Sequence, residues 1–194
     1  EPMGRIYFTA DTHFGHDNVL KLDGRPFASV GEMDDEIVAR WNGKVRQCDT
    51  VYHLGDFSLR FGTAYLSDIL ERLNGEIRLV CGNHDGTLRK MLRNGALPKG
   101  LADKFAFVGD YKEARSEGLR FCMSHYPMPC YNGRCHTRNG ENETIFMLHG
   151  HVHATPEHHA MQAFAYDQNP PMQLVNVGCM LWGYAPAPNA GKGG

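Results

Sequence analysis

The feature that most constrains this fold is a succession of short apolar runs, each about as long as a buried β-strand. The runs cover residues 6–10, 50–54, 77–81, 119–123, 145–148 and 174–177. Short runs rich in β-branched and aromatic side chains are typical of strands whose faces are covered. Residues 111–115 are expected to pair with 119–123 across the hairpin-type connection Ser116-Glu117-Gly118. The sequence therefore predicts sheets that lie inside the molecule.

Helical patterns separate the first three strands. Ser29 and Glu32 have the spacing of a capping box, and apolar side chains then recur at every fourth residue, at Met33, Ile37, Trp41 and Val45. Further helices are expected over residues 64–74, with Gly75 as the stop, and over 87–93. Two polar stretches, 14–28 and 127–144, are expected to be loops. This alternation, followed by strand-rich sequence, predicts a layered α/β domain with mixed sheets.

Length and composition limit the domain count and the partners. The 194 residues suffice for one domain, which we expect over residues 3–184, with a disordered Pro-, Ala- and Gly-rich tail over 185–194. The formal net charge is −2 and the basic residues are scattered, which disfavours an extended surface for duplex nucleic acid. The sequence has neither a membrane-length apolar run nor a leader-like opening, and its six cysteines suit a reducing compartment. We therefore expect a cytoplasmic protein without membrane contact.

The polar residues that follow the strands are metal-binding types. They are Asp11 and His13, Gly55-Asp56, Gly82-Asn83-His84-Asp85, His125, and Gly150-His151-Val152-His153. Any one of these patterns alone is more often an ordinary turn or an exposed histidine. In open α/β sheets, however, ligand sites lie beyond the carboxyl ends of the strands. Five such strand ends in one chain predict a shared metal site at one edge of the sheet.

These motifs, taken in order, resemble the calcineurin-like metallophosphoesterase superfamily from residue 6 to about residue 182. The local sequences Asp-Thr-His-Phe-Gly-His, Arg-Pro-Phe at 25–27 and Val-Tyr-His-Leu-Gly-Asp-Phe at 51–57 resemble a compact branch common in bacteria and phages. The resemblance implies a four-layer αββα fold, in which two stacked mixed β-sheets are flanked by helices. It also implies a binuclear metal-dependent phosphoric ester hydrolase with its site at the strand ends.

The resemblance further implies two sets of metal ligands. The first ion would be held by Asp11, His13 and His153. The second would be held by Asn83, His125 and His151, with Asp56 bridging both ions. Mixed carboxylate, imidazole and amide ligands suit borderline divalent cations, so we expect two divalent ions, with manganese favoured and iron, zinc, nickel or cobalt as alternatives.

Catalytic roles follow from the same resemblance. His84 would contact the phosphate and assist the leaving group, Asp85 would orient the His84 imidazole, and Asn83 would also lie at the substrate. The reaction would be in-line attack on phosphorus by metal-bound hydroxide, without a phosphoenzyme. One departure is Cys179, where this branch usually has an acidic residue; this position is not a metal ligand.

Several residues near the motifs have more than one interpretation. His16 could contact substrate or lie in a solvated loop, and Arg25 could neutralise substrate charge or simply fix its loop. The loop 127–144, with Arg134, His136 and Arg138, is expected to overhang the site and select substrates. A separate zinc site at Cys130, Cys135 and His136 is disfavoured because a fourth ligand is missing. His53 is expected in the core, and His149 is expected to point away from the metals.

The leading hypothesis is a phosphoesterase that prefers phosphodiesters to monoesters, with a nucleotide or single-stranded nucleic acid among its possible substrates. One alternative is a non-catalytic metal-binding scaffold of the same fold, but such a scaffold would tend to lack His84. An unrelated zinc hydrolase would need a denser histidine run. A helical His-Asp phosphohydrolase would carry its pair on a helix, whereas His84-Asp85 follows a strand. The oligomeric state stays open.

Overall fold

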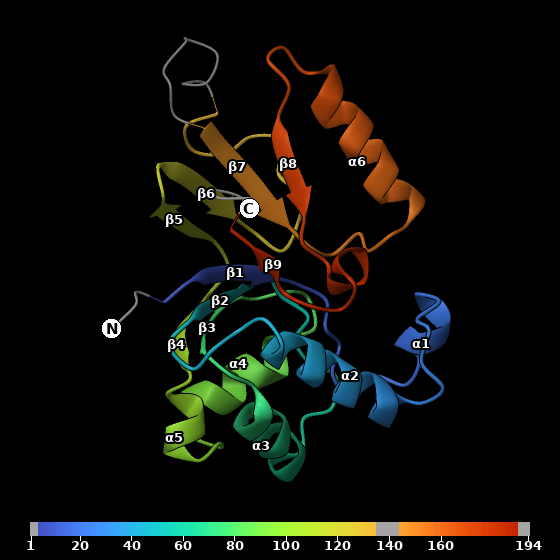
Figure 1. The fold of residues 1–194 in the computed structure, drawn as a ribbon, viewed down its shortest axis with the longest axis vertical. Coiled ribbons are helices and arrows are strands. Elements are labelled where there is room, and N and C mark those ends of the chain that lie inside the picture. The colour runs from blue at the N-terminus through green and yellow to red at the C-terminus, as the bar shows by residue number, and fades with distance from the viewer. Residues whose placement is uncertain (1–3, 135–143, 190–194) are drawn as a thin grey trace.

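Two β-sheets pack face to face between helices in the computed structural model, which describes residues 4–134 and 144–189 (Figure 1). The first sheet has the order β4-β3-β2-β1-β9. Its strands are β1 (Ile6–Thr9), β2 (Thr50–His53), β3 (Glu76–Val80), β4 (Phe105–Gly109) and β9 (Ala187–Pro188). β1 to β4 are parallel, and β9 is antiparallel to β1. The carboxyl ends of four strands therefore lie at one edge.

The second sheet has the order β5-β6-β7-β8. Its strands are β5 (Lys112–Ser116), β6 (Leu119–Met123), β7 (Thr144–His149) and β8 (Gln173–Asn176). β5 and β6 form the expected antiparallel pair, whereas β6, β7 and β8 are parallel. Both sheets are therefore mixed, and in each sheet the parallel strands have their carboxyl ends at the same edge.

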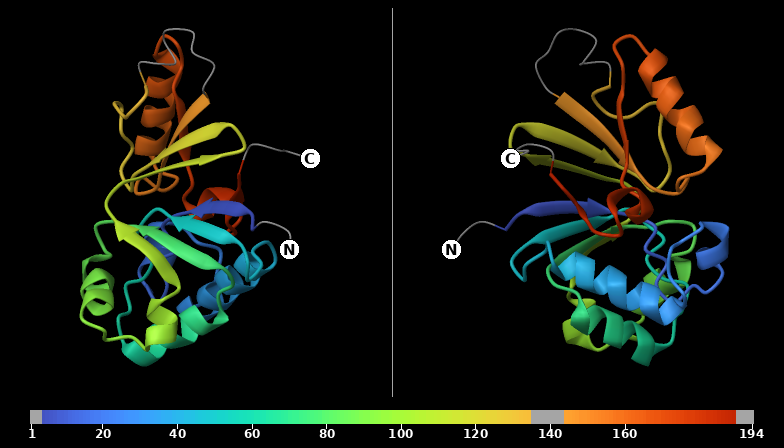
Figure 2. Two further views of the ribbon diagram at one scale, coloured as in Figure 1. Left: turned by 90° about the vertical axis from the view of Figure 1, so that its left-hand side faces the viewer. Right: turned by 45° about the vertical axis from the view of Figure 1, so that its right-hand side comes forward.

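Helices cover the outer face of each sheet (Figure 2). Those on the first sheet are α2 (Val30–Asn42), α3 (Thr63–Arg72), α4 (Gly86–Arg93) and α5 (Lys99–Ala102), and α6 (Pro156–Asp167) covers the second. Two short helices complete the described residues, α1 (Val19–Leu22) and a 3₁₀ helix (Cys179–Trp182). The expected four-layer αββα arrangement is confirmed.

Neighbouring residues of β1 and of β7 enter different cores, because successive side chains point to opposite faces. On β1, Tyr7 packs among the helices of the first sheet, whereas Phe8 packs between the sheets. On β7, Leu148 faces the first sheet, whereas Met147 lies in the core beneath α6. The core between the sheets also contains Phe121, whose ring centroid lies 4.9 Å from that of Phe8. The two sheets are thus held in a defined relative position.

The predicted elements occur within a few residues of their expected bounds, and Ser29 caps α2 by accepting from the Glu32 N–H. β4 and α6 had not been predicted. Within the expected loop 14–28, residues Val19–Leu22 form α1. In the loop 127–144, Asn132 donates a hydrogen bond to the Glu113 carboxylate, and Arg134 donates one to the Pro170 carbonyl. Residues 131–134 therefore lie at the amino ends of β6 and β7 and do not overhang the strand ends, because Gly133 adjoins Arg120 and Ile145.

The expected disordered tail is wrong for residues 185–189. Ala187 pairs with Phe8 and Pro188 with Tyr7, and Ala187 is 3% exposed. Small side chains let this segment lie close to β1, and an edge position tolerates a proline that lacks an N–H. Residues 190–194 lie outside the described residues.

Within 4–134 and 144–189, the helices are all too short or too polar to cross a bilayer. The five cysteines described are free thiols.

A buried carboxylate, Asp49, holds the start of β1 against the turn before β2. It accepts hydrogen bonds from the backbone N–H groups of Arg5 and Arg46 and from the Arg46 guanidinium. Burial alone would raise the pKa of Asp49, but these bonds outweigh burial and lower it to about 2. Asp49 therefore stabilises the fold in its charged form.

We predict that Asp49→Asn lowers the free energy of unfolding by about 2 kcal/mol at neutral pH. Because the folded pKa lies below the unfolded value of 3.8, the stabilisation is present above that value and is lost as pH falls through it towards about 2. The difference between the native protein and the variant should therefore shrink in acid, as measured by urea denaturation at several pH values. Asp103→Asn, at an exposed carboxylate, is the control. A difference independent of pH would contradict this role.

Candidate metal centre

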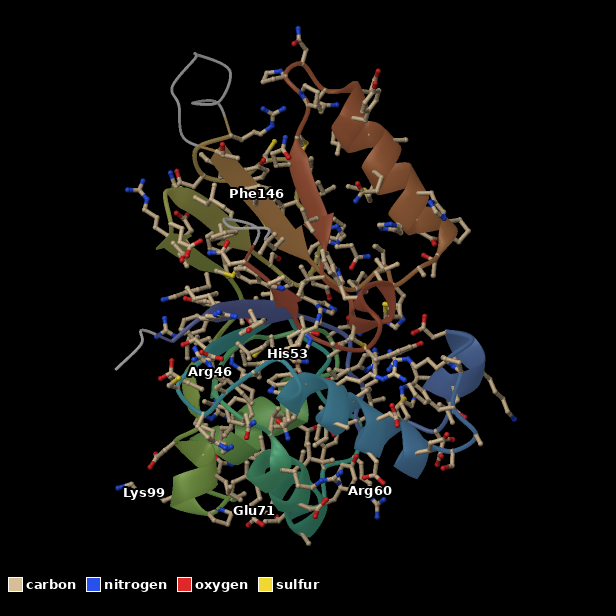
Figure 3. The ribbon with its side chains drawn as sticks, viewed as in Figure 1. Arg46, His53, Arg60, Glu71, Lys99 and Phe146 are labelled. Carbon is tan, nitrogen blue, oxygen red and sulfur yellow. The ribbon has the colours of Figure 1, made fainter. Side chains whose placement is uncertain are left out.

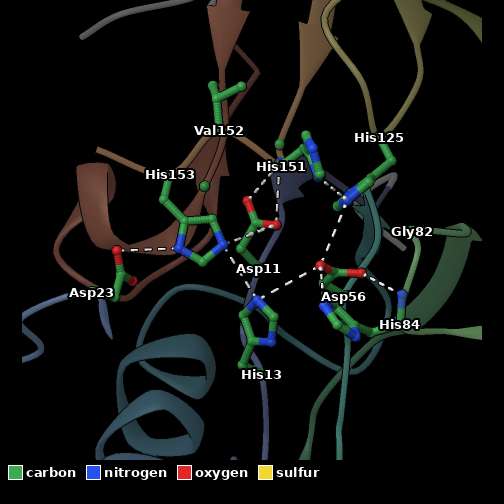
Figure 4. A network of polar contacts seen from close by, with 12 residues as sticks. Asp11, His13, Asp23, Asp56, Gly82, His84, His125, His151, Val152 and His153 are labelled. Carbon is green, nitrogen blue, oxygen red and sulfur yellow. Dashed lines mark hydrogen bonds and ion pairs between the residues drawn. The ribbon is translucent and has the colours of Figure 1, made fainter. Parts of the chain in front are cut away.

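Side chains from five strand ends converge where the two sheets meet (Figure 4). Asp11 and His13 follow β1, and Asp56 follows β2. Asn83 and His84 follow β3, His125 follows β6, and His151 and His153 follow β7. All seven predicted metal ligands lie in this cluster, and the first and second sheets both contribute.

The first predicted ligand set, Asp11, His13 and His153, is compact. The Nε2 atoms of the two imidazoles are 3.3 Å apart, and His153 Nε2 lies 3.7 Å from Asp11 Oδ1. Potential ligand atoms of all three residues lie within 4.8 Å of one another. This spacing would allow them to share one cation.

The second set, Asn83, His125 and His151, is equally close. Asn83 Oδ1 lies 3.0 Å from His125 Nε2 and 3.1 Å from His151 Nδ1. The Leu54 carbonyl, 2.7 Å from His125 Nδ1, can only accept a hydrogen bond, so Nδ1 carries the proton. His125 Nε2 is then unprotonated, and its lone pair faces the side-chain oxygen of Asn83. Such a meeting of acceptors is repulsive by itself and would be relieved by a cation.

Asp56 lies between the two sets. Its Oδ2 is 3.7 Å from His13 Nε2 and 3.6 Å from His125 Nε2. Its Oδ1 accepts a hydrogen bond from the His84 backbone N–H at 3.0 Å. Potential ligand atoms of Asp56, Asp11 and His125 also lie within 4.8 Å of one another. One carboxylate oxygen is therefore anchored, and the other faces imidazoles of both sets.

The backbone of the cluster is strained. Five of the seven predicted ligands have positive φ angles: Asp11, His13, Asp56, His151 and His153. For residues with a Cβ this conformation costs about 1–3 kcal/mol each. It turns the chain abruptly after β1, β2 and β7, so that the ligand side chains that follow these strands face one point.

Two glycines of the motifs permit this close approach. Gly55 has a φ of +94°, and a Cβ there would lie 2.5 Å from Gly82 N and His125 Nδ1. A Cβ on Gly82 would lie 2.3 Å from Asp56 Oδ1. Both contacts are shorter than any side chain tolerates, so the Gly-Asp and Gly-Asn-His-Asp motifs require glycine for packing around the ligands.

Burial sets the protonation of the cluster before any cation binds. It raises the pKa of Asp11 to about 7 and lowers the pKa values of His13, His125 and His151. For His153, burial is outweighed by the carboxylates of Asp23 and Asp11, and its pKa is raised. Neutral imidazole is the form that binds metal ions, so burial prepares His13, His125 and His151 for coordination.

His84 and His16 lie at the open side of the cluster. The His84 side chain is 43% exposed, and its Nε2 lies 3.9 Å from Asp56 Oδ2. The rings of His84 and His16 lie 5.7 Å and 5.3 Å from the ring of His13. A ligand that entered from solvent would meet both rings.

The predicted role of Asp85 is wrong. Its two oxygens accept from the backbone N–H groups of Asp56, Phe57 and Gly82, at 2.7–2.9 Å. Within the described part of the chain, no hydrogen bond joins it to the His84 ring. The Asp85 carboxylate points back beneath the turns that carry Asp56 and Asn83. Its hydrogen bonds therefore hold these two turns together.

The predicted substrate contact of Arg25 is also wrong. Its side chain is 0% exposed, and it donates to the carbonyls of Asp11 and Thr12 and to the carboxylate of Asp23. The alternative interpretation, a loop-fixing arginine, describes it correctly. Sequence reasoning missed Asp23, which contacts His153 Nδ1 at 3.1 Å. A carboxylate two residues before a loop arginine was the available signal.

Other sequence-marked residues surround the cluster. Cys179 is buried and donates its thiol hydrogen to the Asp11 carbonyl, and burial raises its pKa to about 12. His53 lies in the interior, where its Nε2 contacts Thr12 Oγ1, whereas Arg60, Glu71 and Lys99 lie at the outer surface (Figure 3). His149 is buried on the face of β7 that α6 covers. Cys135, His136 and Arg138 lie outside the described residues.

We predict that Asp85→Asn destabilises the protein by about 1–3 kcal/mol, because the amide NH₂ group would face backbone donors in place of an acceptor. The variant should also bind divalent cations more weakly, since the turn that carries Asp56 loses its support. Urea denaturation of the metal-free protein and metal content after dialysis are the measurements. Asp103→Asn serves again as the control, and native-like stability of Asp85→Asn would refute the assignment.

Comparisons with known proteins identify the family of this chain. The sequence-family model of the calcineurin-like phosphoesterase superfamily domain matches residues 5–188. An uncharacterised protein of Methanocaldococcus jannaschii, MJ1445, is 33% identical over 186 residues, which cover 95% of this chain and 86% of that protein. The gene 66 protein of Mycobacterium phage D29 is 29% identical over 78% of this chain and 80% of its own length. The crystal structure of AQ665, a protein of unknown function from Aquifex aeolicus, has a TM-score of 0.68, with 27% identity and 95% coverage of both chains. This chain belongs to the calcineurin-like phosphoesterase superfamily.

Proposed function

We propose that this protein hydrolyses phosphoric esters with two divalent cations held at the cluster. The observation that carries the proposal is the convergence of seven ligand-type side chains beside a solvent-exposed histidine, His84. Asp11, His13 and His153 would hold the first ion, and Asn83, His125 and His151 the second. Asp56 would bridge both ions, since its Oδ2 faces an imidazole of each set.

The residues fit two borderline divalent cations. The lone pair of His125 Nε2 faces an amide oxygen, and the Nε2 atoms of His13 and His153 face each other at 3.3 Å. The carboxylates of Asp11 and Asp56, both buried, would supply negative charge to bound cations at the same point. Imidazole, carboxylate and amide ligands suit manganese, iron, zinc, cobalt or nickel, and we propose manganese as the native metal.

Two such ions, when bound, would supply Lewis acidity that neutralises phosphoryl charge and makes water a better nucleophile. The protein's own contribution is orientation. His84, fixed through its backbone N–H to Asp56 Oδ1, extends its ring over the exposed side of the cluster. From there it can donate to a phosphoryl oxygen or protonate the departing alkoxide, with the water attacking in line from the opposite side.

We further propose that phosphodiesters are preferred to monoesters, and that nucleotides or single-stranded nucleic acid are among the substrates. The exposure of Asn83, His84 and His151 supports this, because it leaves room for a phosphate with two substituents. The scattered basic residues argue against tracking along a duplex. The five free thiols described suit a reducing cytosol, which we propose as the compartment.

We predict that removal of metal ions abolishes hydrolysis and lowers the melting temperature, because the strained ligand turns then lose the charge that compensates them. The metal-free protein should be reloaded separately with manganese, nickel, cobalt, zinc or magnesium and assayed on aryl monoesters, aryl diesters and oligonucleotides. Cleavage of a bis-aryl phosphate without monoesterase activity would support the diester preference. Binding of two ions without turnover of any substrate would instead favour the non-catalytic scaffold.

Separate roles for Asp56 and His84 can be distinguished by substitution. Asp56→Asn should lose both metal loading and activity. His84→Ala should keep both ions, but should slow hydrolysis by about 10²–10⁴-fold for poor leaving groups, which need protonation most. Metal analysis and rates along a series of leaving groups are the measurements, with His159→Ala as the exposed-histidine control. Identical behaviour of the two variants with intact metal content would contradict the assignment.

A further inference from the structure

A buried arginine, Arg25, lies beneath the first ligand set and makes more contacts than loop anchoring needs. Its Nη2 donates to the Asp11 carbonyl at 2.7 Å and its Nη1 to the Thr12 carbonyl at 2.9 Å. Its Nε donates to Asp23 Oδ2, also at 2.9 Å. The rigid guanidinium fork thus holds two consecutive carbonyls in the turn where Asp11 and His13 have positive φ angles.

Asp23 extends this contact to the other sheet. Oδ2 accepts from Arg25, and Oδ1 lies 3.1 Å from Nδ1 of His153. A dashed line in Figure 4 marks the contact between Asp23 and His153. Asp11 and His13 follow β1 of the first sheet, whereas His153 follows β7 of the second. Two buried side chains therefore connect ligands that the two sheets supply separately.

The chemistry of these contacts determines which nitrogen of His153 faces the cluster as a lone pair. An ionised carboxylate can only accept, so His153 Nδ1 carries the hydrogen and Nε2 is left unprotonated when the ring is neutral. Nε2 is the atom that faces Asp11 Oδ1 and His13 Nε2. Asp23 thus sets both the tautomer and the ring orientation that coordination of a cation requires.

We propose that Asp23 and Arg25 are positioning residues that control affinity for the first of the two cations. This inference rests on the proposed metal site but not on its catalytic activity. The second ligand set is oriented by other groups: the Leu54 carbonyl holds His125, and His125, His151 and Asn83 contact one another. Loss of the Asp23–Arg25 pair should therefore lower the protein's affinity for the two ions unequally.

The test is Asp23→Asn, which keeps the size of the side chain. An asparagine has one acceptor oxygen for two donors, so its NH₂ group must face either Arg25 Nε or His153 Nδ1. We expect affinity for one manganese ion to fall by about 10–100-fold while the other ion binds as in the native protein. Calorimetric titration and elemental analysis of dialysed protein measure this, with Asp17→Asn, at an exposed carboxylate of the same loop, as the control. Native affinity for both ions, or an equal loss of both, would overturn the proposal.

A second measurement does not depend on the stability of any variant. At a pH where the His153 ring is neutral, long-range ¹H–¹⁵N spectra of the metal-free native protein should identify it as the Nδ1–H tautomer, and an Nε2–H tautomer would refute the role of Asp23. Arg25→Lys should repeat the selective loss of one ion, because a single ammonium group cannot hold three acceptors as the fork does. Unchanged metal affinity in Arg25→Lys would remove Arg25 from the proposal. All these readouts concern binding, so they keep their meaning even if the native protein binds two ions and hydrolyses no ester.

Discussion

Apolar packing between the two sheets is the interaction on which the rest of the molecule depends. Phe8 of β1 packs against Phe121 of β6 with ring centroids 4.9 Å apart, and Val80 and Leu148 lie in the same core. Because these residues come just before the strand ends, their packing brings the polar residues that follow to one place. The ligand cluster is thus a consequence of sheet stacking, since neither sheet alone carries a complete set.

The cluster concentrates features that would destabilise a protein elsewhere. Positive φ angles, a buried Asp11 carboxyl and imidazole lone pairs that face other acceptors all occur within a few ångströms. Surrounding groups hold this arrangement: Asp85 holds the turn of Asp56, Arg25 holds the turn of Asp11, and Asp23 holds His153. Such strain persists only where the structure around it determines the conformation, and a bound cation would offset part of its cost.

Some features of this protein can be predicted from consecutive residues, and others depend on the folded chain. Strands and ligand candidates could be predicted because apolar runs and the residues after them are properties of consecutive sequence. The roles of Asp85 and Arg25 could not, because they depend on where a side chain points after the chain has turned. Asp85 follows His84 directly, yet both of its oxygens face backbone groups. The tail was misjudged because its small residues have little hydrophobicity of their own, although the open edge of β1 binds them.

By itself, the sequence determined the class of fold, the order of most of the strands along the chain and the chemical types at their ends. These follow from hydrophobic periodicity and from the rule that sites form beyond the carboxyl ends of parallel strands. Only the tertiary structure decided which residues share a ligand set, which buried groups orient them and which histidine faces solvent. Those outcomes depend on distances between residues far apart in the chain, such as Asp23 and His153, and these distances are set by packing between the sheets.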